Sequence, residues 1–101
     1  MEKYLLTFSK QARKDAKLLA GDKLSDKAKE LLEILENDPL QDPPPYEKLH
    51  GELEGMYSRR INSKHRIVYE IRGHDSAEYR GVVHIVRMRT HYKGMLSLLF
   101  I

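Results

Sequence analysis

Four side chains of this 101-residue sequence carry groups that together suit acid–base chemistry on a phosphodiester: Glu47, Arg66, His91 and Tyr92. A carboxylate can accept a proton, and an imidazolium or a phenol can donate one to a leaving oxygen. A guanidinium can stabilise the charge that develops on a phosphate. Each residue alone has an ordinary explanation, because a lone strand histidine is more often structural and a lone loop glutamate is usually solvated. The chemical interpretation therefore depends on whether the fold brings the four together.

A β-hairpin is predicted over residues 55–69, where two runs of β-branched and aromatic residues flank a polar turn at 62–64. In its second run Ile67 and Tyr69 alternate with Arg66, so the apolar side chains can face a core while Arg66 faces outward. Basic side chains are concentrated on this hairpin: Arg59, Arg60, Lys64, His65 and Arg66. A solvated basic face is the ordinary reading, but we interpret the hairpin as a rigid platform for a phosphate.

A further strand is predicted over residues 82–92, with both sides apolar at its start and polar at its end. Its last third carries Arg87, Arg89 and His91 to one edge of the sheet. In an antiparallel pair the start of one strand lies beside the end of the next. Arg66, which opens the second hairpin strand, and His91 are therefore expected at the same edge.

The elements before the hairpin predict an α+β fold. Residues 2–8 alternate as a strand, and Ser9 is a favourable N-cap for a helix that stops at Gly21. A second amphipathic helix is expected from a cap at Ser25 to Asn37, since proline follows at position 39. The prolines at 43–45 impose an extended backbone. They form either a rigid arm that places Glu47 near the sheet or a plain connector, and spacing alone favours the connector.

Composition indicates one small domain over residues 1–101 and a polyanionic partner. Residues 1–55 carry 9 Lys/Arg against 12 Asp/Glu, a net charge of −3, whereas residues 56–101 carry 9 against 3, a net charge of +6. Cysteine is absent, and the five histidines lack the spacing of metal ligands, so neither a metal nor another cofactor is expected. With no apolar run long enough for a membrane and no signal-peptide pattern, a cytoplasmic protein is predicted.

A base, an acid and a phosphate clamp at one sheet edge suit RNA transesterification. The carboxylate would take the proton from a ribose 2′-OH, and the imidazolium or phenol would protonate the leaving 5′-oxygen. DNA lacks the 2′-OH and would be inert to this mechanism. No metal is required by this set of groups.

Several short blocks together resemble the YoeB/Txe toxins of the RelE/ParE toxin–antitoxin superfamily. They are Glu47-Lys48-Leu49, Leu53-Glu54-Gly55, Tyr57-Ser58-Arg59-Arg60-Ile61, His65-Arg66-Ile67-Val68-Tyr69 and His91-Tyr92. The resemblance implies an antiparallel sheet of about four to five strands with two N-terminal helices packed on one face. It also implies the toxin half of a type II toxin–antitoxin pair. Such a toxin is a ribosome-dependent mRNA endoribonuclease that inhibits translation and is held inactive by a cognate antitoxin protein.

By position, the resemblance implies that Glu47 is the general base, Arg66 the transition-state arginine and His91 the general acid, with Tyr92 as the adjacent tyrosine. Arg59 and Arg60 match basic residues that would contact RNA. His50 stands where the family commonly has a lysine, which weakens one phosphate contact or makes it depend on pH.

The apolar extension at 93–101 is the second departure from the family. It can pack as an extra strand, form an oligomer contact such as a homodimer, or crowd the RNA, and the extra strand is favoured. Two other functions stay open: a non-nucleolytic, ParE-like toxin that acts on another target, and a plain RNA-binding module. Codon preference and the identity of the antitoxin do not follow from the sequence.

Overall fold

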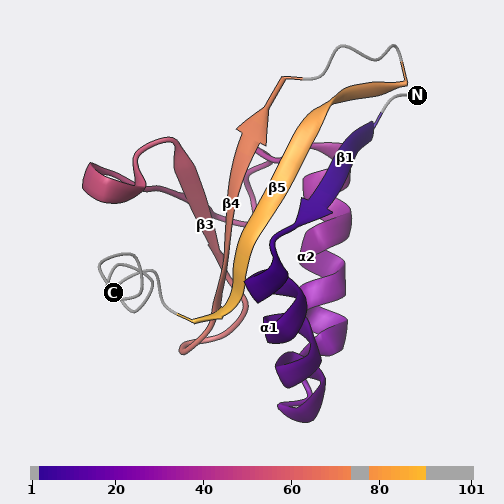
Figure 1. Ribbon diagram of the computed structural model, residues 1–101, viewed down its shortest axis with the longest axis vertical. Coiled ribbons are helices and arrows are strands. Elements are labelled where there is room, and N and C mark those ends of the chain that lie inside the picture. Colours follow the sequence, from indigo (N-terminus) through magenta and orange to yellow (C-terminus); the bar gives the residue numbers. More distant parts are fainter. Residues whose placement is uncertain (1–2, 74–77, 91–101) are drawn as a thin grey trace.

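Five strands and two helices make up the computed structural model, which describes residues 3–73 and 78–90 (Figure 1). In chain order the elements are β1 (Lys3–Phe8), α1 (Lys10–Gly21), α2 (Ser25–Asn37), β2 (Glu47–Lys48), the 3₁₀ helix η1 (Gly51–Leu53), β3 (Met56–Arg60), β4 (Arg66–Arg72) and β5 (Tyr79–Thr90). The strands form a single sheet in the order β1-β5-β4-β3-β2. The predicted α+β class is confirmed.

The sheet is mixed, not entirely antiparallel as expected. Strands β2 to β5 pair antiparallel with one another, but β1 pairs parallel with β5. Parallel neighbours need a long crossover connection. Here the helices carry the chain away from the end of β1, and the β2–β5 meander then brings β5 back to lie beside β1.

Ser9 fixes the first helix to the sheet. Its Oγ accepts a hydrogen bond from the Ala12 amide at 2.9 Å and donates one to the Val86 carbonyl at 2.7 Å. The predicted cap at Ser9 is therefore confirmed. The predicted cap at Ser25 is wrong, because Ser25 is the first residue of α2 and Leu24 occupies the cap position without a side-chain hydrogen bond.

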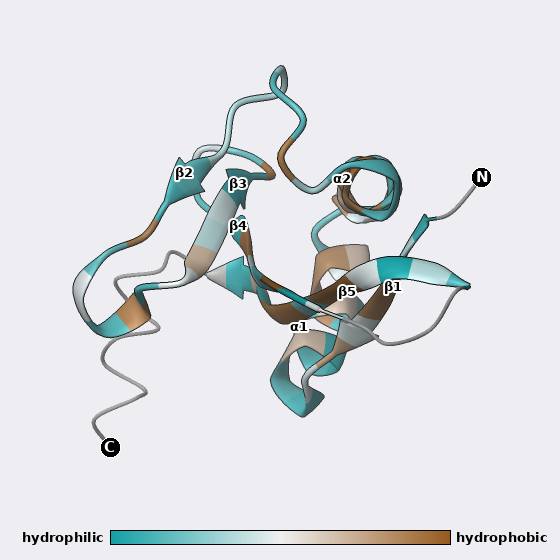
Figure 2. Cartoon of the chain, turned by 90° about the horizontal axis from the view of Figure 1, so that it is seen from above, coloured by the Kyte–Doolittle hydropathy of each residue, from teal (hydrophilic) through white to brown (hydrophobic). Residues whose placement is uncertain are grey.

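The core lies between the helices and one face of the sheet. Figure 2 shows apolar residues of α1, β1 and β5 gathered where helix and sheet meet. Alternation along β4 and β5 puts every second side chain on this face. The fully buried members are Ala12, Leu19, Leu31 and Leu35 from the helices and Ile67, Tyr69, Val83, Ile85 and Met88 from the strands.

A second, smaller apolar cluster comprises Leu49, Leu53 and Val68. Val68 lies between Ile67 and Tyr69 in β4, so its side chain points away from the helices. Leu53 belongs to η1, and the Leu49 amide donates to the Met56 carbonyl at 2.9 Å. This cluster attaches the segment after β2 to the sheet.

Residues 38–46, here called the proline arm, connect α2 to β2. The arm leads directly into Glu47, the first residue of β2, which pairs with Ser58 of β3 in the antiparallel ladder. The plain-connector interpretation is therefore wrong, and the arm does deliver Glu47 to the sheet. The predicted hairpin turn is confirmed, because the Asn62 side chain accepts hydrogen bonds from the Lys64 and His65 amides at 2.8 and 2.7 Å.

Candidate functional site

Glu47 and Arg66 meet on one face of the sheet. Nη1 of Arg66 lies 3.4 Å from Oε1 of Glu47 and donates to Oγ of Ser58 at 3.2 Å. The strand register explains why these two side chains meet. Ser58 is the partner of Glu47 across β2–β3 and of Val68 across β3–β4, and Arg66 lies two residues before Val68, on the same face of β4. The Arg66 side chain is 12% exposed and that of Glu47 is 49% exposed. The carboxylate is thus open to solvent, whereas the arginine side chain beside it is mostly buried.

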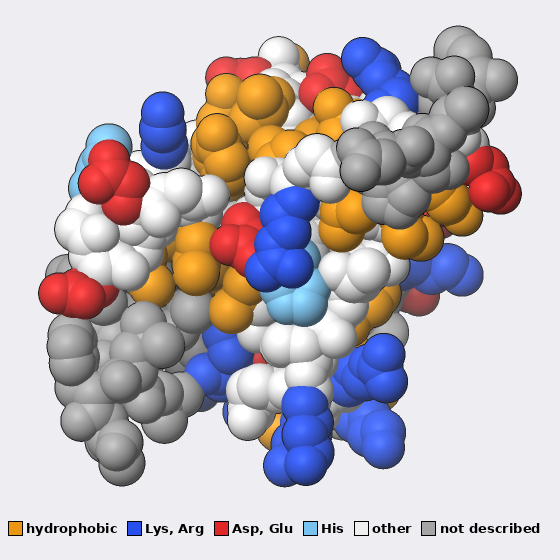
Figure 3. Space-filling view, turned by 45° about the horizontal axis from the view of Figure 1, so that its top comes forward, with side chains coloured by type: hydrophobic (Ala, Val, Ile, Leu, Met, Phe, Trp, Pro, Cys, Tyr) orange, Lys and Arg blue, Asp and Glu red, His pale blue; other side chains and the backbone are white. Residues whose placement is uncertain are grey.

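The pair lies in an open cleft of about 310 Å³. Its walls come from the proline arm and from β2, β3 and β4, and its lining residues are Pro45, Tyr46, Glu47, Ser58, Arg60 and Arg66. Two guanidinium groups and one carboxylate in a cleft of this size suit a phosphate that carries an attached hydroxyl. On the face drawn in Figure 3, the side chains of Lys and Arg predominate in the lower part of the molecule.

Strand β5 ends beside this cleft. Thr90, its last residue, pairs with Arg66 across the antiparallel ladder. The expectation that the end of this strand lies beside Arg66 is confirmed. His91 and Tyr92, together with the extension at 93–101, lie outside the described residues, so the roles predicted for them stay predictions.

Arg59 does not face the cleft, and the prediction that it contacts RNA is corrected. Its side chain alternates with those of Ser58 and Arg60, which puts it on the opposite face of β3. There it is 1% exposed and its guanidinium donates to carbonyl oxygens of the proline arm. A buried guanidinium with these partners is not available to a nucleic acid.

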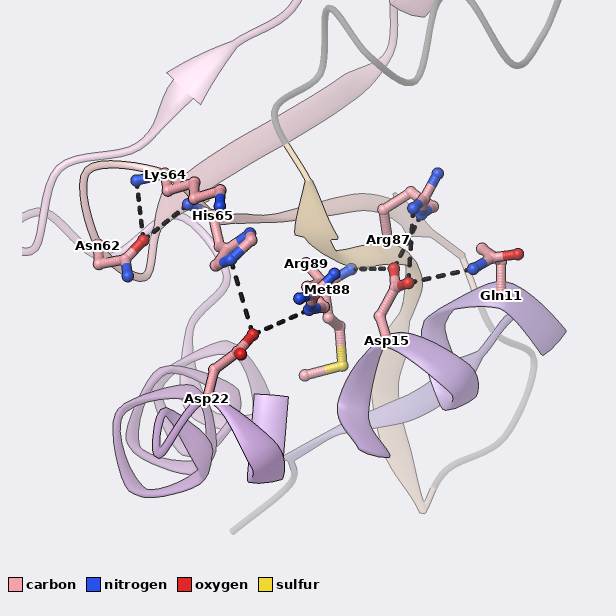
Figure 4. A network of polar contacts seen from close by, with 9 residues as sticks. All are labelled: Gln11, Asp15, Asp22, Asn62, Lys64, His65, Arg87, Met88 and Arg89. Atoms are coloured by element: carbon pink, nitrogen blue, oxygen red, sulfur yellow. Dashed lines mark hydrogen bonds and ion pairs between the residues drawn. The ribbon is translucent and has the colours of Figure 1, made fainter. Parts of the chain in front are cut away.

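Arg87 is likewise corrected, because it is buried against α1 (Figure 4). Its Nε donates to Oδ2 of Asp15 at 2.8 Å, and the same carboxylate accepts hydrogen bonds from the Met88 amide at 2.9 Å and the Gln11 side chain at 3.1 Å. Burial by itself raises the pKa of the Asp15 carboxyl, but these hydrogen bonds outweigh it and lower the pKa below its ordinary value.

Arg89 and His65 converge on Asp22, at the end of α1 (Figure 4). Nε of Arg89 donates to Oδ2 of Asp22 at 2.9 Å, and Nε2 of His65 lies 3.8 Å from the same oxygen. His65 is 5% exposed, so the prediction that it contacts RNA is corrected. Arg89 stays partly exposed but is directed to α1 and not to the cleft.

The remaining predicted contacts, His50, Arg60 and Lys64, are exposed. Arg60 lines the cleft, Lys64 lies in the hairpin turn, and His50 precedes η1. Sequence reasoning did not select Tyr46 or Ser58, which also line the cleft. Ser58 could have been found from its period-two relation to Arg60, whereas Tyr46 had no signal beyond its place before Glu47.

Two classes of feature are missing from the part of the chain that the structure describes. No group of three or more His, Cys, Asp or Glu side chains could hold a metal ion there. In the same residues, no helix is long and apolar enough to cross a membrane.

The fold is shared with bacterial toxins of known structure. YoeB/ParE toxin from Agrobacterium tumefaciens superposes with a TM-score of 0.75 over 87% of this chain and 99% of that one; at 23% identity the likeness shows the fold. YoeB from Staphylococcus aureus, solved in a YoeB–YefM complex and as a YoeB dimer, gives a TM-score of 0.67 at 35% and 36% identity, covering 88% of this chain and 98% of that one. The fold is that of a toxin of this structural class.

The sequence is similar to one family of such toxins over most of its length. Residues 8–92 match the family described as YoeB-like toxin of bacterial type II toxin–antitoxin systems. Toxin YoeB of Synechocystis sp. is 36% identical over 63 residues, a match that spans 62% of this chain and 65% of that protein. The chain belongs to the YoeB-like toxin family of bacterial type II toxin–antitoxin systems.

Proposed function

We propose that this toxin is a ribosome-dependent mRNA endoribonuclease that stops translation. The observation that carries the proposal is the Glu47–Arg66 pair, a solvent-open carboxylate 3.4 Å from a guanidinium in a cleft beside the end of β5. A buried carboxylate could not reach a substrate hydroxyl. A carboxylate without a nearby guanidinium would lack a group to bind the phosphate. The cleft supplies both groups together.

In the proposed reaction, Glu47 takes the proton of the ribose 2′-OH and the 2′-oxygen attacks the adjacent phosphorus. The bond from phosphorus to the 5′-oxygen breaks, leaving a 2′,3′-cyclic phosphate and a 5′-hydroxyl. Arg66 stabilises the charge on the phosphorane oxygens, an effect typically worth about 3–4 kcal/mol. In this proposal His91 protonates the departing oxygen, and Tyr92 is the next residue in the sequence. Each proton transfer typically contributes about 10²–10⁴ in rate.

Binding in this proposal comes from the exposed basic groups around the cleft. Arg60 and Arg66 lie in the cleft itself, and His50 and Lys64 are exposed on neighbouring segments. These side chains would contact the mRNA backbone in the ribosome, which places the action in the cytoplasm. Arg59, Arg87 and His65 are left out because they are buried.

Primer extension on mRNA in a translating bacterial extract tests the proposal. Wild-type protein should produce cuts at ribosome-occupied codons, and Glu47→Gln and His91→Gln should lose them while staying folded. Glu33→Gln is the matched control, because Glu33 is an exposed carboxylate on α2 and should leave the cuts unchanged. Intact mRNA with wild type, together with growth arrest in cells, would refute the proposal and favour the non-nucleolytic alternative. Unchanged cuts in both site variants would refute the assigned residues.

We also propose a cognate antitoxin as the protein partner, and a homodimer as the form without it. The support is the family membership and the S. aureus structures, one with YefM and one as a dimer. A thermal-shift titration with the product of the adjacent gene should raise the unfolding temperature of the toxin. No stabilisation at saturating concentrations would count against the antitoxin, and a monomer mass in light scattering would count against the dimer.

A further inference from the structure

The proline arm contains all four prolines of the chain, at positions 39, 43, 44 and 45. Proline has no amide hydrogen, so a segment this rich in proline has few donors with which to satisfy its own carbonyl groups. The carbonyl oxygens of the arm therefore need donors from elsewhere in the protein. Figure 2 shows the arm running from the end of α2 to β2, beside β3.

Arg59 supplies those donors. Its Nη1 donates to the Pro44 carbonyl at 2.6 Å, and its Nη2 donates to the carbonyls of Pro39 and Gln41 at 3.0 and 2.8 Å. Its Nε donates to Oη of Tyr69 at 3.1 Å, and that hydroxyl donates in turn to the Pro39 carbonyl at 2.8 Å. One buried guanidinium thus binds the arm at three residues spread over its length.

The end of the arm next to the cleft is held by the same side chain. Cζ of Arg59 lies 5.1 Å from the centre of the Tyr46 ring, within cation–π distance, and that ring packs edge-on against Tyr57 at 5.8 Å. Tyr46 directly precedes Glu47. Strand β2 is only two residues long, so its own ladder is a weak restraint on Glu47.

We propose that Arg59 is a positioning residue for the reaction: it fixes the proline arm on the helix-side face of β3 and thereby holds the Glu47 carboxylate beside Arg66 on the opposite face. The effect on catalysis rests on the proposed nuclease function, whereas the effect on the arm does not. Lysine cannot replace Arg59, because a single ammonium group cannot reach three carbonyls and a phenol at once.

Single-turnover cleavage on programmed ribosomes tests the catalytic part with Arg59→Lys. The rate at saturating ribosome should fall by roughly 10–100-fold, because a displaced catalytic group reacts slowly, with little change in KM. In a Glu47→Gln background the same substitution should cause no further loss. A loss of equal size in both backgrounds would overturn the inference, since a general loss of structure lowers any residual activity.

Two further variants separate positioning from stability. Ile85→Val or Leu31→Ala, whichever matches the melting temperature of Arg59→Lys, weakens the core and should cleave as wild type does. Tyr69→Phe removes the hydroxyl bridge but keeps the ring and Arg59, and it should lower the rate in the same direction by a smaller factor. If Arg59→Lys does not fold, Tyr69→Phe decides, and wild-type cleavage by this variant would overturn the inference.

Amide hydrogen exchange gives a readout that does not depend on nuclease activity. The amides of Glu47, Lys48 and Leu49 should exchange faster in Arg59→Lys than in wild type, while those of α1 should be unchanged. Equal protection of these three amides in both proteins would overturn the inference. If wild-type protein failed to cut mRNA but this local loss of protection occurred, the nuclease proposal would fail and the positioning of the arm would stand.

Discussion

Arginine–carboxylate pairs occur on two sides of this small sheet, and they differ in what surrounds the carboxylate. On the α1 side, Asp15 is 2% exposed by its side chain and lies 2.8 Å from Nε of Arg87. In the cleft, Glu47 is 49% exposed and lies 3.4 Å from Nη1 of Arg66. The two arginine side chains are about equally buried, with exposed fractions of 11% for Arg87 and 12% for Arg66. The accessibility of the carboxylate is what distinguishes the structural pair from the pair that we propose to react.

The Asp15–Arg87 pair also lies at an irregular part of the sheet. The β4–β5 register shifts between Arg66 and Tyr69, near the stretch of β5 that contains Arg87 and Met88. Oδ2 of Asp15 accepts the Met88 amide as well as the guanidinium, so it satisfies a backbone donor at this point. Among the hydrogen bonds of the described residues, the Glu47 carboxylate in the cleft accepts none from a backbone amide.

The largest expected effect is on stability, for Asp15→Asn. This change leaves the buried Arg87 charge without its partner, which typically costs about 3–5 kcal/mol. The pKa of Asp15 is lowered, so its stabilisation is complete above the ordinary value of 3.8 and is lost as pH falls through the lowered pKa. Urea unfolding at pH 7 and at decreasing pH should show a difference that narrows in acid.

The double variant Asp15→Asn/Arg87→Met sharpens this prediction. Replacing both partners removes the buried charge, so part of the lost free energy of unfolding should return. A double variant that is less stable than Asp15→Asn by the full cost of a second defect would contradict the description of these residues as a coupled buried pair.

A slightly smaller effect, on activity, is expected for Arg66→Lys. Lysine keeps the charge but loses the planar fork, so cleavage on programmed ribosomes should fall by about 10²–10³, with little change in thermal unfolding. Arg72→Lys is the matched control, since Arg72 ends the same strand with its side chain 57% exposed. Equal cleavage by wild type and Arg66→Lys would contradict the distinction between Asp15–Arg87 as a structural pair and Glu47–Arg66 as a reactive one.

An intermediate effect is expected at alkaline pH for Tyr69, the residue that joins Arg59 to the proline arm. Burial raises the pKa of Tyr69 to about 12, although the nearby Arg59 opposes the shift. The stabilisation is complete below the ordinary value of 10.0 and is lost as pH rises through about 12. Two pKa units correspond to about 2–3 kcal/mol. Between these pH values the free energy of unfolding should fall by that much more in wild type than in Tyr69→Phe, and parallel pH curves would contradict the assignment.

The smallest effect is expected for Arg89→Gln, which removes the partly exposed pair with Asp22. Both side chains are about one-third exposed, so the loss should be about 0.2–1 kcal/mol. It should shrink at high salt, because exposed charges are screened. Urea unfolding at low and high salt measures it. A cost as large as that of Asp15→Asn would show that exposure does not rank these pairs.

Much of the fold could be predicted because its signals are local. Ser9 caps α1 as its residue type indicates, and the alternation in β4 correctly puts Ile67 and Tyr69 in the core. The antiparallel neighbours β4 and β5 correctly bring Thr90 beside Arg66. The parallel β1–β5 pair was not predicted, since pairing between distant strands leaves no local pattern in either one.

The roles of the arginines could be predicted only in part. Period-two alternation correctly separates Arg59 from Arg60, but it does not show which face is covered. The proline arm buries one face, so Arg59 becomes structural while Arg60 lines the cleft. Similarly, Arg87 was expected at an open edge, but α1 presents Asp15 there.

The sequence by itself determined the helices, the hairpin, the basic half of the chain and the family. Each of these depends on which residue types occur at short spacing along the chain. Only the tertiary structure decided that Glu47 joins Arg66, that Asp15 pairs with Arg87, and that the proline arm accepts the hydrogen bonds of Arg59. The physical reason is that an arginine acts according to the groups that surround it. The carboxylates and carbonyls that bind Arg59, Arg66 and Arg87 lie 15 to 72 residues away from them along the chain.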